Sequence, residues 1–236
     1  MNASRAAVNV VLVHGAWADG SSWARVITSL QSWGLRVFAA PIPLTSLSDD
    51  IAALERTLER TDGPVVLVAH AYAGAVIGAS INERVQSLVF IAALTPDQGE
   101  TVGEVFYREK PHTEAPQLAP DAYGFIWMPD ERFGAAFCQD ASPEEAALLA
   151  ATQRPIALAC IQEKAPKPAW RTRPSWYLVA EEDRMINPVT QRFLAGRMAA
   201  TIRSEKVDHT PLVTAPELVV EIILQAVTSW ATRQNT

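Results

Sequence analysis

Short, nearly continuous apolar runs recur along the chain, and between them apolar positions are spaced three and four residues apart. Runs of the first kind predict buried parallel strands, and the second spacing predicts helices that cover them. Together they predict an α/β fold, in which a doubly wound, mostly parallel sheet carries helices on both faces. The strands are expected at residues 8–13, 35–39, 65–69, 85–94, 175–180 and 202–207.

Helix boundaries are predicted from residues that commonly cap or end helices. A first helix places Trp23, Val26 and Leu30 on one face and ends at Gly34. Another follows the strand at 65–69 and runs to about Ile81. The expected capping groups are Ser21 or Ser22 for the first helix, Ser48 for the second and a Thr214–Glu217 capping box for the last.

The pattern changes between about residues 97 and 173, where strand-like runs vanish and prolines become frequent. We interpret this stretch as a small, mainly helical cap inserted into a single domain of residues 1–236. Ligands of open α/β sheets bind at the carboxyl ends of the strands, so the cap is expected to lie over that edge. Short helices are expected within it near 130–138, from Ser142 with Glu145, and near 156–163. Its aromatic residues supply three predicted substrate contacts: Tyr107, Phe125 and Trp127.

Composition excludes several classes of function. The formal net charge of −6 argues against nucleic acid and anionic membranes as partners and leaves a small-molecule substrate. No apolar stretch reads as a targeting or membrane-spanning segment, which predicts a cytoplasmic protein. No glycine-rich phosphate loop is present and no metal-ligand spacing is evident, so neither a metal nor an organic cofactor is expected. The residues considered for ligand spacing are Cys138, Cys160, His14, His70, His112 and His209.

The stretch from Val65 to Gly74 predicts a strand that turns sharply into a helix. Small residues at Ala69, Ala73 and Gly74 allow the strand and helix backbones to approach closely, as a nucleophile elbow requires. In such an elbow the middle residue of the turn carries the attacking group. Here that residue is Ala71, which has no nucleophilic atom.

Two further chemical groups follow predicted strands. Asp183 lies just beyond the strand at 175–180, and His209 lies just beyond the last strand. Nucleophile, acid and histidine then stand in the chain order of an α/β-hydrolase triad. A histidine in this arrangement takes a proton as general base, and the carboxylate fixes its tautomer. Glu182 and Asp208 are rival acids for the same role.

On these motifs the chain resembles the α/β-hydrolase superfamily. It is most similar to the small group that contains plant methylesterases, hydroxynitrile lyases and bacterial esterase-like relatives. Besides the elbow, the shared residues are His14 to Trp17, Ser22 with Trp23, Pro41 to Asp49, Glu182 to Arg184 with Pro188, and Asp208, His209 and Pro216.

The resemblance implies an oxyanion hole formed by the backbone N–H groups of Ala16 and Tyr72. It also places Trp17 and His70 beside the substrate, although His70 is expected chiefly to support the elbow. A homodimer is an expectation at the level of the family only. The family pattern has serine where this chain has Ala71, so either the serine was replaced deliberately or the natural protein lost it.

Three functions remain open. The first is hydrolysis of small apolar carboxylic esters by Ser-His-Asp acyl transfer, with the nucleophile absent. The second is general-base chemistry by a His209–Asp183 dyad, as in a lyase, an isomerase or a cofactor-free oxygenase. The third is a pseudo-hydrolase that binds a small ligand without changing it.

Overall fold

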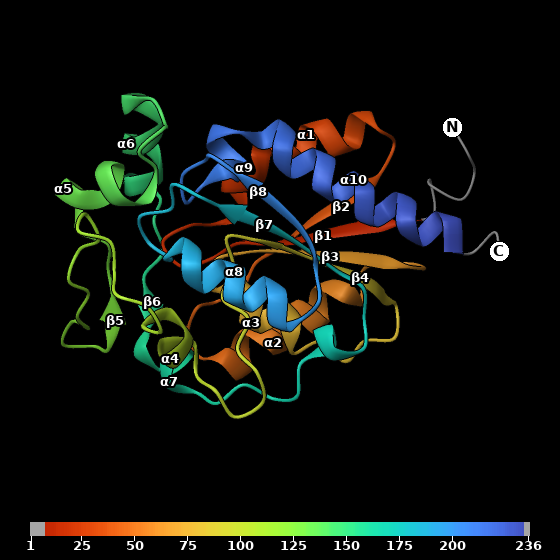
Figure 1. Cartoon of the computed structure of the whole chain (residues 1–236), viewed down its shortest axis with the longest axis horizontal. Coiled ribbons are helices and arrows are strands. Elements are labelled where there is room, and N and C mark those ends of the chain that lie inside the picture. Colours follow the sequence, from red (N-terminus) through yellow and green to blue (C-terminus); the bar gives the residue numbers. More distant parts are fainter. Residues whose placement is uncertain (1–7, 234–236) are drawn as a thin grey trace.

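A six-stranded parallel sheet forms the centre of the molecule (Figure 1), in a computed structural model that describes residues 8–233. Its strand order is β2-β1-β3-β4-β7-β8, and every neighbouring pair is parallel. The predicted α/β fold class is therefore confirmed. The strands are β1 (Asn9–Val13), β2 (Arg36–Ala40), β3 (Val65–His70), β4 (Val85–Ile91), β7 (Ser175–Ala180) and β8 (Thr201–Glu205).

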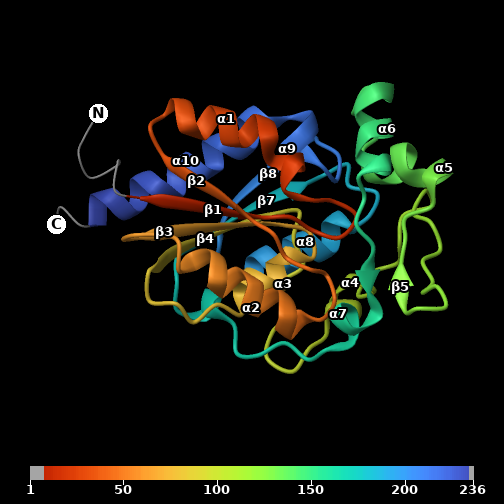
Figure 2. The same ribbon diagram turned by 180° about the vertical axis from the view of Figure 1, so that it is seen from behind.

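Helices cover both faces of the sheet (Figures 1 and 2). On β1, Val10 and Leu12 belong to the core on one face, while Val11 and Val13 belong to the core on the other. Successive side chains of a strand point to opposite faces, so a strand covered on both sides is apolar throughout. One face carries η1 (Gly20–Trp23), α1 (Ala24–Ser32), α9 (Pro211–Thr214) and α10 (Pro216–Arg233), and the other carries α2 (Leu47–Leu58), α3 (Ala73–Gly78) and α8 (Pro188–Arg197).

The segment between β4 and β7 carries short elements, several of which lie at one end of the sheet (Figure 1). The predicted capping box at Ser142 is confirmed, because its hydroxyl accepts from the Glu145 N–H and the Glu145 carboxylate accepts from the Ser142 N–H. Two short strands that the sequence pattern did not predict pair antiparallel here. The elements are α4 (Val102–Phe106), β5 (Phe125–Ile126), α5 (Asp130–Arg132), the π-helical turn η2 (Phe133–Phe137), α6 (Pro143–Ala151), β6 (Ile156–Ala157), α7 (Leu158–Gln162) and η3 (Ala169–Arg171).

Two predicted helix caps are wrong. The Asp19 carboxylate, and not a serine, caps the first helical turn by accepting from the Ser21 N–H. Helix α2 is capped by Ser46, whose hydroxyl accepts from the Asp49 N–H. Ser48 lies inside that helix, because the helix already begins at the buried Leu47.

Three predicted boundaries also differ. Strand β4 ends at Ile91, because Ala92 has φ = 43° and leaves the extended conformation. Helix α3 ends at Gly78, three residues before the predicted Ile81. Thr214 does not cap the last helix, since its hydroxyl donates to the Asp208 carboxylate at 2.7 Å.

Candidate active site

The turn between β3 and α3 is a sharp, strained elbow. Ala71 has φ = 50°, in the left-handed region that costs a non-glycine residue energy and is tolerated where the surroundings hold it. A Cβ at Gly74 would lie 2.4 Å from the Leu94 carbonyl oxygen, and one at Gly15 would lie 2.9 Å from the Ala71 Cβ. The backbone around position 71 is therefore packed as closely as a nucleophile elbow requires.

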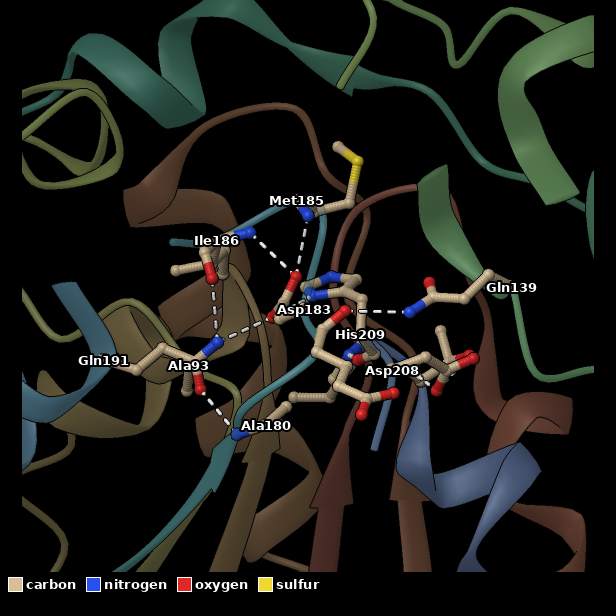
Figure 3. A network of polar contacts seen from close by, with 12 residues as sticks. Ala93, Gln139, Ala180, Asp183, Met185, Ile186, Gln191, Asp208 and His209 are labelled. Atoms are coloured by element: carbon tan, nitrogen blue, oxygen red, sulfur yellow. Dashed lines mark hydrogen bonds and ion pairs between the residues drawn. The ribbon is translucent and has the colours of Figure 1, made fainter. Parts of the chain in front are cut away.

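A buried histidine–carboxylate pair lies beside this elbow (Figure 3). His209 follows β8 and Asp183 follows β7, and their Nδ1 and Oδ2 atoms are 2.8 Å apart. Oδ1 of Asp183 accepts from the N–H groups of Met185 and Ile186, at 2.7 and 2.9 Å. Its Oδ2 also accepts from the Gln191 side chain at 2.7 Å. Four donors thus fix the carboxylate, and the carboxylate fixes the imidazole ring.

The two rival acids point elsewhere. Glu182 is exposed, and its backbone carbonyl accepts from the Gln139 side chain. The Asp208 carboxylate accepts from the N–H groups of Asp140 and Thr210 and from the Thr214 hydroxyl. Burial raises the pKa of Asp208. The structure therefore places Asp183, and neither of its neighbours in the sequence, against the His209 ring.

Two further histidines are buried: His70, next to the pair, and His14, near His70. His70 donates through Nε2 to the carbonyl oxygen of His209 at 2.8 Å, and the two ring centroids are 4.8 Å apart. Burial, reinforced by the nearby His209, lowers the pKa of His70 well below its ordinary value. Burial also lowers the pKa of His14 to about 4. Both rings are therefore neutral near pH 7, and His70 braces the loop that carries His209.

An apolar cavity of about 150 Å³ opens beside position 71. Ala16, Trp17, Ala71, Tyr72, Tyr107 and His209 all line it, so six of the predicted site residues share one space. Among residues 8–233, no Asp, Glu, Lys or Arg contributes to the lining. The remaining lining residues are Leu94, Val102, Phe106, Leu118, Pro120, Ile126, Ile156, Leu158, Ile161, Met185 and Ile186. His209 thus brings an imidazole, a group able to act as general base, to an otherwise apolar wall.

Three residues that were predicted to contact substrate lie outside this lining. His70 is turned toward the His209 backbone, as described above. Phe125 is only half-buried in β5. Trp127 is 49% exposed, and its ring N–H donates to the Asp121 carboxylate at 3.3 Å. A hydrogen bond within the inserted segment thus holds the Trp127 ring, and a hydrogen bond to the His209 backbone holds the His70 ring.

The backbone N–H groups of Ala16 and Tyr72 border the cavity without a protein acceptor anywhere in residues 8–233. The neighbouring Trp17 N–H donates to the Arg154 carbonyl at 2.9 Å, and the Trp17 ring donates to the Ile126 carbonyl at 3.0 Å. These two bonds hold the loop that presents the Ala16 N–H. Two free donors beside an elbow can bind the oxygen of a polarised carbonyl.

A buried carboxylate behind the elbow was not predicted. Asp50 is fully buried and accepts from the Tyr72 hydroxyl at 2.6 Å, from the Leu44 N–H at 2.7 Å and from the Cys160 thiol at 3.7 Å. Its spacing from Leu47 and Leu54 puts Asp50 on the apolar face of α2, and that pattern could have identified it. Through this carboxylate, α2 contacts both the elbow and α7.

Phe137 is a second residue that the sequence did not single out. It ends the π-helical turn η2, and its ring centroid lies 5.1 Å from that of His209 and 6.1 Å from that of Trp17. The ring is fully buried, so it excludes water from one side of the imidazole. Single π-turns are frequent at functional sites, but the sequence alone does not reveal them.

The order of position 71, Asp183 and His209 along the chain, and their meeting at one sheet edge, define an α/β hydrolase. The chain belongs to the alpha/beta hydrolase family, whose sequence model matches residues 10–222. Among residues 8–233, no cluster of three or more His, Cys, Asp or Glu side chains is placed to hold a metal ion. Within the same range, no helix is both long enough and apolar enough to cross a bilayer.

The chain is similar to a curated plant protein and to several solved hydrolase structures. Salicylic acid-binding protein 2 from Nicotiana tabacum is 26% identical over 249 residues, covering 91% of this chain and 95% of that protein. A pyrethroid hydrolase, solved as a serine-to-alanine variant, matches with a TM-score of 0.82 at 19% identity, over 95% of this chain and 99% of that chain. A methylesterase from Arabidopsis matches with a TM-score of 0.76 at 18% identity, over 94% and 99%. The predicted resemblance to the methylesterase-like group is confirmed.

Proposed function

We propose that this chain carries an ester hydrolase site for small, apolar carboxylic esters, complete except for its nucleophile. The observation that carries the proposal is the His209–Asp183 pair, which lies with two free N–H groups around a strained elbow at position 71. Family membership and the esterase relatives support the reaction class.

Each part of the site has a role in acyl transfer. The ester carbonyl oxygen would accept from the N–H groups of Ala16 and Tyr72, which also bind the oxyanion of the tetrahedral intermediate. A serine hydroxyl at position 71 would give its proton to His209 Nε2 as it attacks. Asp183 would stabilise the imidazolium, which then protonates the departing alcohol. With Ala71 the site retains binding and polarisation but forms no acyl-enzyme.

The cavity supports a neutral, apolar substrate. Tyr72 and Trp17 direct their polar atoms to Asp50 and to the Ile126 carbonyl, so little polarity remains on the walls. In the part of the chain that the structure describes, no Lys or Arg lines the space. An ester with short apolar groups on both sides of its carbonyl fits these walls better than a charged or strongly polar molecule.

The test is the variant Ala71→Ser, assayed beside the protein with Ala71 on p-nitrophenyl acetate and butyrate. Loss of a triad serine costs on the order of 10⁶-fold in kcat, so serine should restore several orders of magnitude of turnover. His209→Ala should abolish that gain. Ala71→Gly is the matched control, since it changes the same position without adding a hydroxyl. If serine produces no more turnover than glycine, the proposal is wrong.

A second candidate function is general-base catalysis by the His209–Asp183 dyad without a covalent step. The favouring observation is that every hydrogen bond that orients the pair is independent of position 71. Such a dyad could remove a proton from a carbon next to a carbonyl. Proton exchange of a small ketone in D₂O, followed by NMR, tests this function. Exchange that is undiminished in His209→Ala would rule it out.

A further inference from the structure

We propose that the site, with alanine at position 71, hydrolyses activated esters by directing water at the carbonyl carbon. His209 is the general base, and no acyl-enzyme forms. The reaction uses the binding site of the proposed function, because the ester carbonyl lies between the same two N–H groups. It differs from that function in its nucleophile.

The His209 ring has the correct nitrogen available. Nδ1 is engaged with Asp183 Oδ2 at 2.8 Å, which makes Nδ1 the protonated nitrogen and Nε2 the acceptor. Within residues 8–233 no side chain or backbone group hydrogen-bonds to Nε2, while the ring itself contributes to the cavity lining. The lone pair of Nε2 is therefore free to accept a hydrogen bond from a molecule bound in the cavity.

The floor of the cavity admits a water molecule at the position of a nucleophile. Ala71 ends at its methyl group, and Ala71 and His209 line the same space. We infer that a water molecule can occupy the place beside the imidazole that a serine hydroxyl at position 71 would fill. A single water needs about 10–15 Å³ of such volume, whereas the cavity offers about 150 Å³. Water and a small ester can occupy it together.

The groups that contact the imidazole ring add no positive charge next to it. The His70 ring, whose centroid lies 4.8 Å from that of His209, is neutral because burial lowers its pKa. Among residues 8–233, Asp183 is the carboxylate that hydrogen-bonds to the His209 ring. Phe137 covers another side of the imidazole, which directs proton transfer toward the cavity.

The step balances without any other reactant. The water oxygen forms a bond to the carbonyl carbon, one water proton moves to His209 Nε2, and the carbonyl electron pair moves to the oxygen held by the Ala16 and Tyr72 N–H groups. Collapse re-forms the carbonyl and breaks the bond to the leaving group. A phenolate or thiolate departs as the anion, and His209 returns its proton to the leaving group or to solvent. Aryl esters and thioesters are therefore the substrate class, since these leaving groups depart readily.

The experiment uses the protein with its own Ala71 and p-nitrophenyl butyrate. The expected result is saturable turnover on the order of 10⁵-fold above buffer, from about a thousandfold through the oxyanion hole and binding and about 100-fold through His209. No burst of nitrophenolate and no acyl adduct in the intact mass are expected. General-base catalysis contributes at least about 100-fold, so His209→Asn should lower the rate by that factor. Asparagine keeps a donor for Asp183, and His209→Gln provides a second variant if the first folds poorly.

Two results would overturn the proposal. One is an unchanged rate in both folded His209 variants, and the other is an acyl adduct on the protein during turnover. The variant Ala71→Ser separates this inference from the proposed function. A burst and a butyryl adduct in that variant support the proposed acyl transfer, and their absence counts against it. Neither result bears on the water reaction. The water reaction is judged only in the protein that has alanine at position 71.

Discussion

The neutral state of His14 makes stability depend on pH in a calculable way. Burial lowers the pKa of its imidazole from about 6.5 to about 4 in the folded protein. The unfolded chain therefore binds a proton at this residue at a pH where the folded chain does not. Stability from this group is complete above about pH 6.5 and is lost as the pH falls toward 4. Between pH 7.5 and 5.0 the linkage relation gives a loss of about 2 kcal/mol.

Other buried groups add to or oppose this dependence. The pKa of His70 is shifted in the same direction, so it adds to the loss at low pH. Burial raises the pKa values of Asp50 and Asp208, and those carboxyl groups oppose it because their folded forms bind protons more tightly. The contribution of His14 is therefore obtained from a difference between variants and not from the total pH dependence.

The perturbation is His14→Asn. The asparagine amide can still donate to the Gly15 carbonyl, which the His14 Nδ1–H reaches at 3.0 Å, but it does not titrate. Urea unfolding at pH 7.5 and 5.0, followed by tryptophan fluorescence, gives the free energy of unfolding of each protein. Between pH 7.5 and 5.0, the free energy of unfolding of the variant should fall by about 2 kcal/mol less than that of the parent. His112 is exposed, so His112→Asn should leave the difference unchanged. An equal pH dependence in the parent and His14→Asn would show that the pKa of His14 is not lowered in the folded protein.

Two further predictions concern packing and the buried network. Asp50→Ala removes the acceptor of the Tyr72 hydroxyl, and each buried donor left unpaired costs about 1–3 kcal/mol. Urea unfolding should therefore show a free energy of unfolding that is lower by this amount or more. Asp50→Asn should lose less stability, because one acceptor oxygen remains. Gly74→Ala would place a Cβ 2.4 Å from the Leu94 carbonyl oxygen and should lower the stability of the protein by about 1–3 kcal/mol. The control is Gly196→Ala in α8, where a Cβ would have nothing within 4 Å. Thermal unfolding should show this variant to be as stable as the parent or more stable.

Much of the fold follows from the periodicity of apolar residues. A strand such as β3 is apolar at nearly every position because both of its faces are covered, and that pattern is visible without a structure. Helix boundaries depend on partners that are distant in sequence. Thr214 has the sequence context of a cap, but Asp208 captures its hydroxyl. Ser48 likewise lies inside α2 because Ser46 caps the helix.

The site is predictable only in part. The order of position 71, an acid and His209 is written in the sequence, because residues after parallel strands gather at one sheet edge. The choice of Asp183 over Asp208 depends on which carboxylate the fold leaves free to meet the imidazole ring. The cavity wall depends on side-chain direction within short, irregular elements. Trp127 turns to Asp121 and Phe137 turns to His209, and no periodic pattern encodes either orientation.

The rate at which the Cys160 thiol is alkylated reports on motions of the inserted segment. The thiol is fully buried on α7, 3.7 Å from the Asp50 carboxylate, and burial raises its pKa to about 12. An alkylating reagent can reach it only while α7 is displaced, so the labelling rate measures how often the segment opens. Leu158 and Ile161 of the same helix line the cavity, so a ligand bound there would lower the labelling rate of Cys160. In a Cys138→Ser background, Cys160 would be the single remaining cysteine thiol, so no engineered cysteine is needed.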